Sequence, residues 1–441
     1  MPKPISLAQS TENNLTVSIA SYVGNGTDDT FKAADISLDG QTIILGGKLS
    51  QEQNNIKSTD LLGGGEGVVF FQGPKENYIS RLPGEVTDLE VNPTTGQIAV
   101  AYGSGVAVLS PDAKAVVWSV EADTASRVSI NNTGRVVALV KSNGKDKAVL
   151  YSEEGVILQE WLSDSGNRYF QDVAISQEGY GIIVISGFTQ ARRNLQVGFI
   201  HAVTYNGPSR WKAYDYSASQ VDAVNLLADT RCNRVAFGHD GKLYVASWVN
   251  GGTGYSIFSR EVGDLNKKSE AVVITDNYTN AYNTGTVAMT FFGEHDIETG
   301  ALVKGQSLLT RRSKGRGNSI TPDSITADES GNIFIAGKAN AAIKNRDAKT
   351  INGQPVASYG AADGFLYCIS PDLKERYTWT PFHLCLNAIA AVRGSTFVVG
   401  ATCKPDAEQV IINPLQDQPT GTGSKAYFLM SKDEPIPTTP E

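Results

Sequence analysis

Short runs in which apolar and polar residues alternate recur in pairs along the whole chain. The clearest pair lies at 322–338, PDSITADESGNIFIAGK, where two alternating runs flank the polar turn DESGN. Alternation with a period of two is typical of half-buried strands, and a short Asp/Ser/Gly/Asn turn between two such runs predicts a β-hairpin. Stretches of the same form lie at 33–47, 87–102, 126–140, 171–187 and 387–400, with another between 221 and 248. The pattern therefore predicts a series of hairpins of one kind.

Most of these hairpins precede a second, less regular pair of strands. Such pairs lie at 67–82, 105–120, 147–162, 197–216, 285–309 and 364–379. Repeated four-stranded antiparallel units are the sequence signature of a β-propeller, in which each unit forms one blade. We therefore expect an all-β chain, a single seven-bladed propeller over residues 15–432, between an N-terminal tail at 1–14 and a Pro-rich C-terminal tail at 433–441. Its repeats are predicted to start near residues 31, 86, 126, 171, 221, 322 and 387.

The two ends of the chain predict a closed ring. The last repeat has its hairpin and a third strand at 425–431, after which DEPIPTTPE is too rich in proline for a ladder strand. A spare strand at 15–23 precedes the first repeat. We expect this strand to pair with 425–431 and to close the ring, because closure removes the exposed edge that an open array would leave.

The fifth repeat allows two registers. Either 221–237, VDAVNLLADTRCNRVAF, is the hairpin, or 233–248, NRVAFGHDGKLYVASW, is the hairpin. The pattern alone leaves both open. Long insertions at 49–65, 250–285, 338–359 and 404–424 are predicted to be surface loops, which often carry binding residues.

Composition and charge narrow the class of protein. A net charge of −8 argues against binding to nucleic acid or acidic membranes, which requires a clustered basic excess. No stretch approaches the roughly 20 apolar residues of a membrane-spanning helix, and the N-terminus has no apolar run of signal-peptide length. We therefore expect a soluble protein that stays in the cytoplasm or enters a particle, such as a virion or an injection-type assembly.

The four cysteines predict neither a disulfide scaffold nor a zinc site. Cys232, Cys368, Cys385 and Cys403 are scattered and have no C-x-x-C spacing. Buried free thiols are the main expectation. A disulfide between two of the last three, which fall on neighbouring repeats, is the alternative.

The innermost strand of each propeller blade lines the central channel, so polar residues that begin this strand are candidate site residues. Six residues meet this condition: Asp88, Arg127, Asp172, Asp222, Asp323 and Asn387. Asp222 belongs to them only under the first register of the fifth repeat. Carboxylates at a channel mouth suit a cation or a basic side chain. A short Asp side chain at such a place also caps backbone amides of a neighbouring segment, and this structural role is the main expectation.

Other chemistry-bearing residues are sparse. The histidines fall on different repeats without paired spacing, His239 stands in a predicted turn, and neither a nucleophile elbow nor a phosphate-binding loop is present. No metal or other cofactor is expected. One basic cluster, in a Gly/Ser-rich link, would attract a phosphate or an acidic partner or would simply be a solvated loop: Arg311, Arg312, Lys314 and Arg316.

Part of the chain resembles a known repeat family. ADGFLYCISPDLKERYTW at 362–379, VGNGTDDTFKAADISLDGQTIILGG at 23–47 and SKGRGNSITPDSITADESGNIFIAG at 313–337 are similar to the beta-propeller repeats called SBBP. In those repeats a D-G-F strand and a Trp-ended strand precede a Gly/Asp-rich link and a D-x-x-G-N hairpin. The resemblance implies a seven-bladed propeller and brings no settled activity.

Two functions of different classes are consistent with these observations. The leading one is a non-catalytic propeller that binds a protein or a surface glycan, or forms a structural part of a larger assembly. The alternative is a metal-dependent enzyme, of the hydrolase or lactonase type, in which Asp88, Asp172 and Asp323 hold a divalent ion in the channel.

Overall fold

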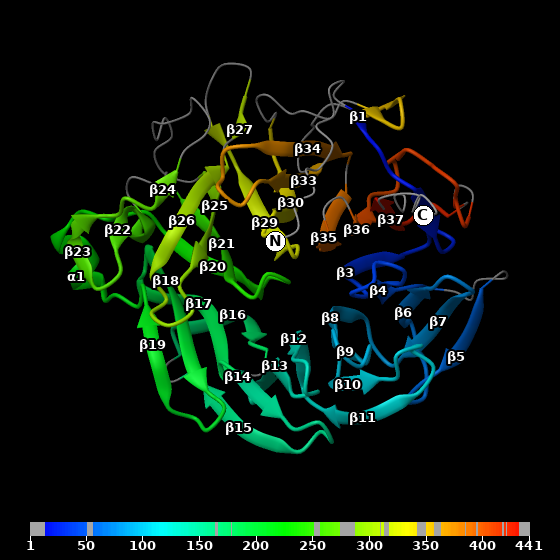
Figure 1. Cartoon of the computed structure of the whole chain (residues 1–441), viewed down its shortest axis with the longest axis horizontal. Coiled ribbons are helices and arrows are strands. Elements are labelled where there is room, and N and C mark those ends of the chain that lie inside the picture. The colour runs from blue at the N-terminus through cyan, green and yellow to red at the C-terminus, as the bar shows by residue number, and fades with distance from the viewer. Residues whose placement is uncertain are drawn as a thin grey trace, which may run out of the picture.

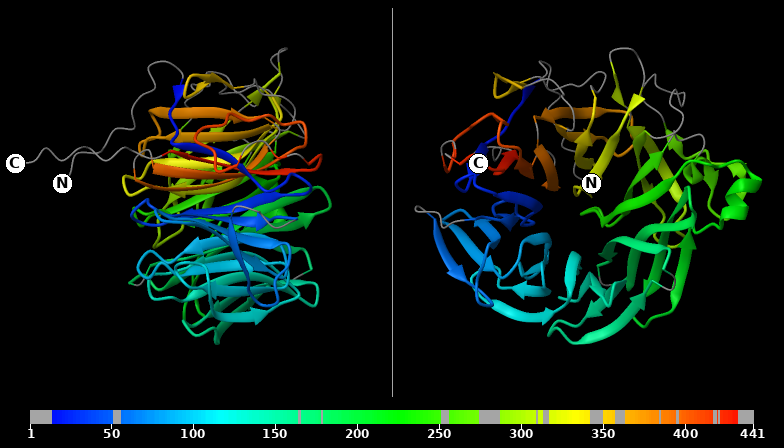
Figure 2. Two further views of the ribbon diagram at one scale, coloured as in Figure 1. Left: turned by 90° about the vertical axis from the view of Figure 1, so that its right-hand side faces the viewer. Right: turned by 180° about the vertical axis from the view of Figure 1, so that it is seen from behind.

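Antiparallel sheets surround a central opening like the blades of a propeller (Figure 1), and the side view shows a thick disc (Figure 2). The computed structural model describes residues 14–50, 56–163, 166–177, 179–250, 256–273, 287–308, 310–312, 317–341, 350–356, 363–383, 385–393, 396–416, 419 and 421–431. Within these ranges no helix is long and apolar enough to cross a membrane. The sheets contain mostly four antiparallel strands each, so the predicted all-β propeller with four-stranded antiparallel blades is confirmed.

The described residues form eight sheets of three or more strands, of which seven have four or five strands. These seven are numbered blades 1 to 7 in the order of their innermost strands. From the channel outward, blade 1 contains β3 (Thr30–Ile36), β4 (Ile43–Lys48), β6 (Gly67–Gln72), β7 (Asn77–Leu82) and β5 (Lys57–Asp60). Blade 2 contains β8 (Val86–Val91), β9 (Ile98–Tyr102), β10 (Gly105–Leu109) and β11 (Val116–Glu121). Blade 3 contains β12 (Thr124–Ile130), β13 (Val136–Ser142), β14 (Lys145–Tyr151) and β15 (Ile157–Leu162).

The second half of the ring follows the same order. Blade 4 contains β16 (Arg168–Ile175), β17 (Ile182–Arg192), β18 (Leu195–Thr204) and β19 (Ser209–Ala213). Blade 5 contains β20 (Thr230–Phe237), β21 (Leu243–Asn250), β25 (Ala288–His295), β26 (Leu302–Leu308) and β24 (Val272–Val273). Blade 6 contains β29 (Ile320–Ala327), β30 (Ile333–Ala339), β33 (Asp363–Ile369) and β34 (Arg376–Phe382). Blade 7 contains β35 (Cys385–Arg393), β36 (Thr396–Cys403), β37 (Lys425–Ser431) and β2 (Ile19–Val23).

The remaining elements are short and lie in the connections. The eighth sheet contains β1 (Asn14–Leu15), β31 (Thr350–Ile351) and β32 (Gln354–Pro355), and two ribbons contain β22 (Arg260–Glu261) with β23 (Asp264–Lys268) and β27 (Thr310–Arg311) with β28 (Gly317–Asn318). A helix, α1 (Ala218–Ala223), and a 3-10 turn, Ile257–Ser259, complete the described elements. The sequence pattern indicated seven repeated units and missed this eighth sheet, because two-residue strands are too short to show a period of two.

The fifth repeat adopts the second of the two registers. β20 pairs with β21, from Thr230 opposite Val249 to Phe237 opposite Leu243, so the turn between them is the His-Asp-Gly segment. The repeat start predicted near residue 221 was therefore wrong. Residues 218–223 are helical because Ser217 caps the helix and forms a capping box with Gln220.

Apolar side chains of neighbouring blades form the core between them. One cluster joins Val106 and Val108 of blade 2 to Val136 and Val149 of blade 3, and others join the next pairs in the same way. Trp118 of β11 also packs on Tyr151 of β14, with ring centroids 5.6 Å apart. Each blade therefore buries both of its faces against its neighbours, which explains why the second strands read as continuous apolar runs.

Blade 7 contains strands from both ends of the chain. β2 pairs antiparallel with β37, from Ile19 opposite Met430 to Val23 opposite Ala426. The Tyr22 side chain is fully buried, and its hydroxyl donates to the carbonyl oxygen of Ala407 at 3.0 Å. That this ladder holds the ring together as one cooperative unit stays a prediction.

Deletion of residues 1–24 removes β1 and β2 and exposes the outer edge of β37. We expect thermal unfolding of the truncated chain to lose its cooperativity, because blade 7 then lacks its fourth strand and the apolar contacts of Tyr22. The control is deletion of residues 1–13, which leaves both strands and should unfold like the full chain. Identical calorimetric transitions for both truncations would contradict the prediction.

Candidate functional site

A shared irregularity in the inner strands sets which side chains face the channel. In six of them the ladder to the second strand skips one residue near its start: Lys32, Thr87, Ser126, Gln171, Asn233 and Asp323. Such a β-bulge turns the strand and re-aims the residues that follow. The residue directly after the bulge belongs to a layer around the channel, which comprises Ala33, Asp88, Arg127, Asp172, Arg234 and Ser324.

Charges alternate in sign around this layer. Asp88, Arg127, Asp172 and Arg234 stand on blades 2 to 5 in turn, and on blade 6 Asp323 directly precedes the layer. Asp172 lies between the two guanidinium groups, 3.7 Å from Nε of Arg127 and 3.8 Å from Nη1 of Arg234. Its side chain is only 9% exposed, so the two arginines are its counter-charges.

The structure brings together most of the predicted channel residues. Asp88, Arg127 and Asp172 share one position, as the sequence alignment of the repeats predicted, whereas Asp323 lies one position earlier, at the bulge itself. Arg234 is the member that the sequence missed. Its position is visible only in the second register of the fifth repeat, where it follows the bulge at Asn233.

A second layer lies two residues further along the inner strands, on the same side because side chains alternate. It contains Asp35, Glu90 and Ser129, on blades 1, 2 and 3. Sequence reasoning missed these three residues, although their spacing of two from the first layer was a signal that could have found them.

Carboxylates in both layers bind backbone amides of the next blade. Asp35 accepts from Val91 N–H at 2.6 Å, Asp88 from Val128 N–H at 3.0 Å, and Asp172 from Val235 N–H at 3.0 Å. Glu90 accepts from Ile130 N–H at 3.3 Å, and the Ser129 hydroxyl from Ile175 N–H at 3.1 Å. An innermost strand has a free edge, and its N–H groups there need acceptors when they are buried. The neighbouring blade supplies these acceptors.

Other hydrogen bonds join the remaining pairs of neighbouring blades. Ser324 of blade 6 donates to the carbonyl of Ile389 in blade 7 at 3.2 Å, and Thr402 of blade 7 donates to the carbonyl of Phe31 in blade 1 at 3.1 Å. The amide of His239, after β20, donates to the carbonyl of Ala327 in blade 6 at 2.9 Å. Within the described residues, each of the seven pairs of neighbouring four- or five-stranded sheets is thus bridged by at least one hydrogen bond.

Burial shifts the protonation of several channel carboxyl groups. Desolvation raises the pKa of Asp35 to about 7, that of Asp88 to about 6 and that of Glu90 to about 8. For Asp88 the charge of Arg127 opposes this effect, whereas Asp172 adds to it. Desolvation, followed by the charge of Arg234, lowers the pKa of Arg127. Near neutral pH the carboxyl groups of Asp35, Asp88 and Glu90 are therefore partly protonated.

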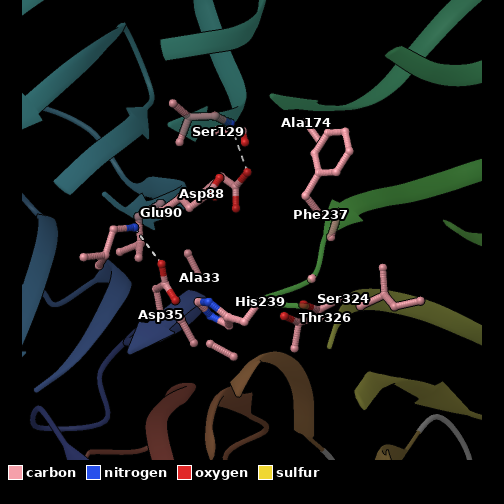
Figure 3. Close-up of a pocket in the computed structure, with 18 of the residues that line it drawn as sticks. Ala33, Asp35, Asp88, Glu90, Ser129, Ala174, Phe237, His239, Ser324 and Thr326 are labelled. Atoms are coloured by element: carbon pink, nitrogen blue, oxygen red, sulfur yellow. Dashed lines mark hydrogen bonds between the residues drawn. The ribbon is translucent and has the colours of Figure 1, made fainter. Parts of the chain in front are cut away.

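The opening that these layers surround has a volume of about 540 Å³. Figure 3 shows Asp35, Asp88 and Glu90 on the side of blades 1 and 2, with Phe237 and His239 of blade 5 reaching in from the other side. Gly238 to Gly241 form the turn that carries His239, so the turn predicted at this histidine is present. Desolvation lowers the pKa of His239, so the ring is neutral at physiological pH.

Asp222 is not a channel residue. It lies on α1, outside the ring of inner strands, where its half-exposed carboxylate pairs with Arg192. The prediction was wrong because it rested on the first register of the fifth repeat. Asn387 lies in β35 opposite Ala401, which places its backbone on an inner strand.

The predicted basic cluster is only partly described. Arg312 is exposed, and Arg311 ends β27. Lys314 and Arg316 lie outside the described residues. The cluster therefore stays a predicted partner surface.

The described histidines, cysteines and acids do not form a metal centre. No group of three or more of these side chains within the described ranges is placed to hold a metal ion. Cys232 and Cys368 are buried free thiols, but Cys403 is disulfide-bonded, so the free-thiol expectation was wrong for Cys403. Cys385 stands opposite Cys403 in the β35–β36 ladder.

Comparison with known proteins supports the propeller assignment. The family model of the SBBP beta-propeller repeat matches residues 308–343. This part of the chain is therefore similar to the SBBP repeat. The matched segment contains the β29–β30 hairpin, so the resemblance predicted from 313–337 is confirmed there.

A solved structure of low sequence identity is similar to this chain. It is the Neurospora crassa Pan2 WD40 domain, with 9% identity, a TM-score of 0.42, and coverage of 80% of this chain and 90% of that one. No curated protein matches the sequence significantly.

Replacement of Asp172 tests the charged layer. Asp172→Asn removes the counter-charge that Arg127 and Arg234 share, so we expect the free energy of unfolding to fall by about 3 kcal/mol, as when one partner of a buried ion pair is lost. Asp222→Asn is the control, because an exposed pair contributes at most about 1 kcal/mol. Urea unfolding measures both. Equal stabilities of the two variants would refute a structural role for Asp172.

The raised carboxyl pKa values predict that stability falls with rising pH. The native state keeps protons on Asp35 and Glu90 that the unfolded chain has lost, so their contribution is present below pH 4 and is lost as pH rises through about 7 to 8. The slope is at most about 1.4 kcal/mol per pH unit for each group. Asp35→Asn with Glu90→Gln should flatten the curve between pH 5 and 8, and an unchanged slope would contradict the assignment.

Proposed function

We propose that the chain is a non-catalytic β-propeller scaffold that binds a protein partner through surfaces outside its channel, as a component of a larger assembly. The observation that carries this proposal is the use of the channel side chains. Asp35, Asp88, Glu90 and Asp172 each accept a backbone N–H of the neighbouring blade. Side chains that hold the ring together are poorly suited to change partners during a reaction cycle.

The arrangement of charge argues against the alternative of a metal-dependent enzyme. A divalent ion bound by Asp88, Asp172 and Asp323 would lie beside Arg127 and Arg234, which stand between these carboxylates on the intervening blades. The like charges of the arginines would repel the ion, and the buried setting would strengthen this repulsion. The same arginines already neutralise Asp172.

The exposed apolar side chains of the outer surface favour a protein rather than a glycan as the partner. Several large apolar side chains on the outer strands are half exposed, among them Val117 at 48% and Leu162 at 49%. Exposed apolar groups that gather on one side of a molecule are typical of protein interaction surfaces. The partner is therefore expected at the rim of the disc.

A metal titration discriminates between the two functions. We expect millimolar Ca²⁺, Mg²⁺, Mn²⁺ or Zn²⁺ to leave the Tm unchanged, because an ion that binds only the native state would raise it. A rise in Tm that Asp88→Asn abolishes would overturn the scaffold proposal in favour of a channel metal site. Asp222→Asn serves as the control for adventitious surface binding.

Cross-linking tests the position of the partner. The immobilised chain is exposed to lysate of its source cells, and captured protein is cross-linked and mapped by mass spectrometry. Cross-links to rim residues with none to the channel support the proposal. A chain that stays monomeric at high concentration and captures no protein would overturn it.

A further inference from the structure

The blades differ in how their outer edges are covered. In blade 1, β5 lies parallel to the fourth strand β7, from Lys57 opposite Tyr78 to Asp60 opposite Arg81. In blade 5, β24 lies parallel to the fourth strand β26. Both extra strands come from the long insertion between the second and third strands of the blade. The fourth-strand edge of this ring therefore accepts a parallel fifth strand.

Blade 3 has no strand of its own for this place. β13 and β14 are joined by the tight turn at Asn143 and Gly144, so no insertion can fold back, and within the described residues β15 is the last strand of its sheet. Figure 1 shows β15 on the outer rim of the disc. No strand of the described residues covers its outer edge.

The open edge of β15 is also unusually apolar. Val156 is 61% exposed, Ile157 51%, Leu158 41% and Leu162 49%. The outer strand of blade 4 exposes Ser209, Arg210 and Lys212 instead, and that of blade 6 is largely buried. Natural sheets usually protect an edge with charges, proline or a covering segment. An unprotected apolar edge is therefore the expected form of a strand-docking site.

The backbone of β15 offers hydrogen-bonding groups in the outward direction. The amide of Ser163 donates to the carbonyl of Asp146 across the β14–β15 ladder at 3.1 Å. Because successive residues of a strand alternate in direction, Leu162 and Glu160 direct their N–H and C=O groups away from β14. An added strand would pair with these groups.

The charges around this edge indicate the chemistry of the partner. Glu153, Glu154 and Glu160 flank the apolar residues and are exposed, and of these only Glu160 pairs with a lysine, Lys147, at 2.9 Å within the described ion pairs. We propose that β15 docks an extended segment of a partner protein, apolar with flanking Lys or Arg residues, as a parallel fifth strand. This inference rests on the proposed scaffold function and assigns it a surface.

A synthetic peptide tests the site directly. The probe is a fluorescein-labelled KKVTVTVKK peptide, whose binding to the full chain is followed by fluorescence anisotropy. We expect saturable binding that Leu162→Lys weakens by at least about tenfold, because a charge then faces the apolar segment. Val303→Lys is the matched control, since Val303 is 49% exposed on β26, whose edge already carries β24.

A second probe cannot form the backbone hydrogen bonds but keeps the charge of the peptide. The same peptide with N-methyl groups on alternate amides should lose its affinity. In a separate experiment, a spin label is placed on the N-terminus of the unmethylated peptide. If this peptide binds parallel to β15, the label should broaden resonances near Ile157. Equal binding of both peptides, or equal binding to the two lysine variants, would overturn the proposal. Broadening near Leu162 would overturn the parallel orientation.

Two outcomes separate this inference from the proposed function. If the peptide does not bind while a captured protein cross-links elsewhere on the rim, the β15 site fails and the scaffold function stands. A dimer of the wild-type chain that Leu162→Lys dissociates would make a second copy the occupant, which would also overturn the proposed partner.

Discussion

The ring depends on acceptors for the free edges of its innermost strands. A strand that lines a narrow channel has no further strand to pair with, and its buried N–H groups would each cost free energy if left without a partner. Asp35, Asp88 and Asp172 meet this need by accepting an N–H of the next blade. The carboxylates are therefore part of the backbone hydrogen-bonding scheme, and Arg127 and Arg234 compensate the charge of Asp88 and Asp172 in the interior.

The sequence was sufficient to predict the propeller architecture and three of the six residues in the first channel layer. Hairpins with alternating residues located the inner strands, and Asp88, Arg127 and Asp172 could be aligned because their repeats have similar lengths. Alignment failed for Asp323, because this residue is the one that the bulge of its strand skips, whereas Asp88 directly follows the bulge of its own strand, and a period-two pattern does not mark which residue is skipped. It failed for Asp222 because the apolar residues before Arg234 fit either of two registers.

Other features lay beyond any pattern in a single sequence. The fifth strands β5 and β24 pair in parallel with strands that follow them in the chain, and their few residues show no alternation. From the sequence, a disulfide among the last three cysteines was only an alternative, and spacing along the chain could not decide that Cys403 is disulfide-bonded. Likewise, the acceptor role of Glu90 and Ser129 depends on contact between blades rather than on local sequence.

The channel side chains are thus assigned to ring stability and the rim to partner binding. Amide hydrogen exchange in the native state, followed by NMR on deuterated protein, tests this assignment most directly. We expect the amides of Val91, Val128 and Val235 to exchange only through global unfolding, because the carboxylates of the preceding blades hold them. The outward-facing amide of Leu162, on the open edge of β15, should exchange rapidly in the same sample. Exchange of the three valine amides as fast as that of Leu162 would contradict the claim that the channel side chains hold the ring together.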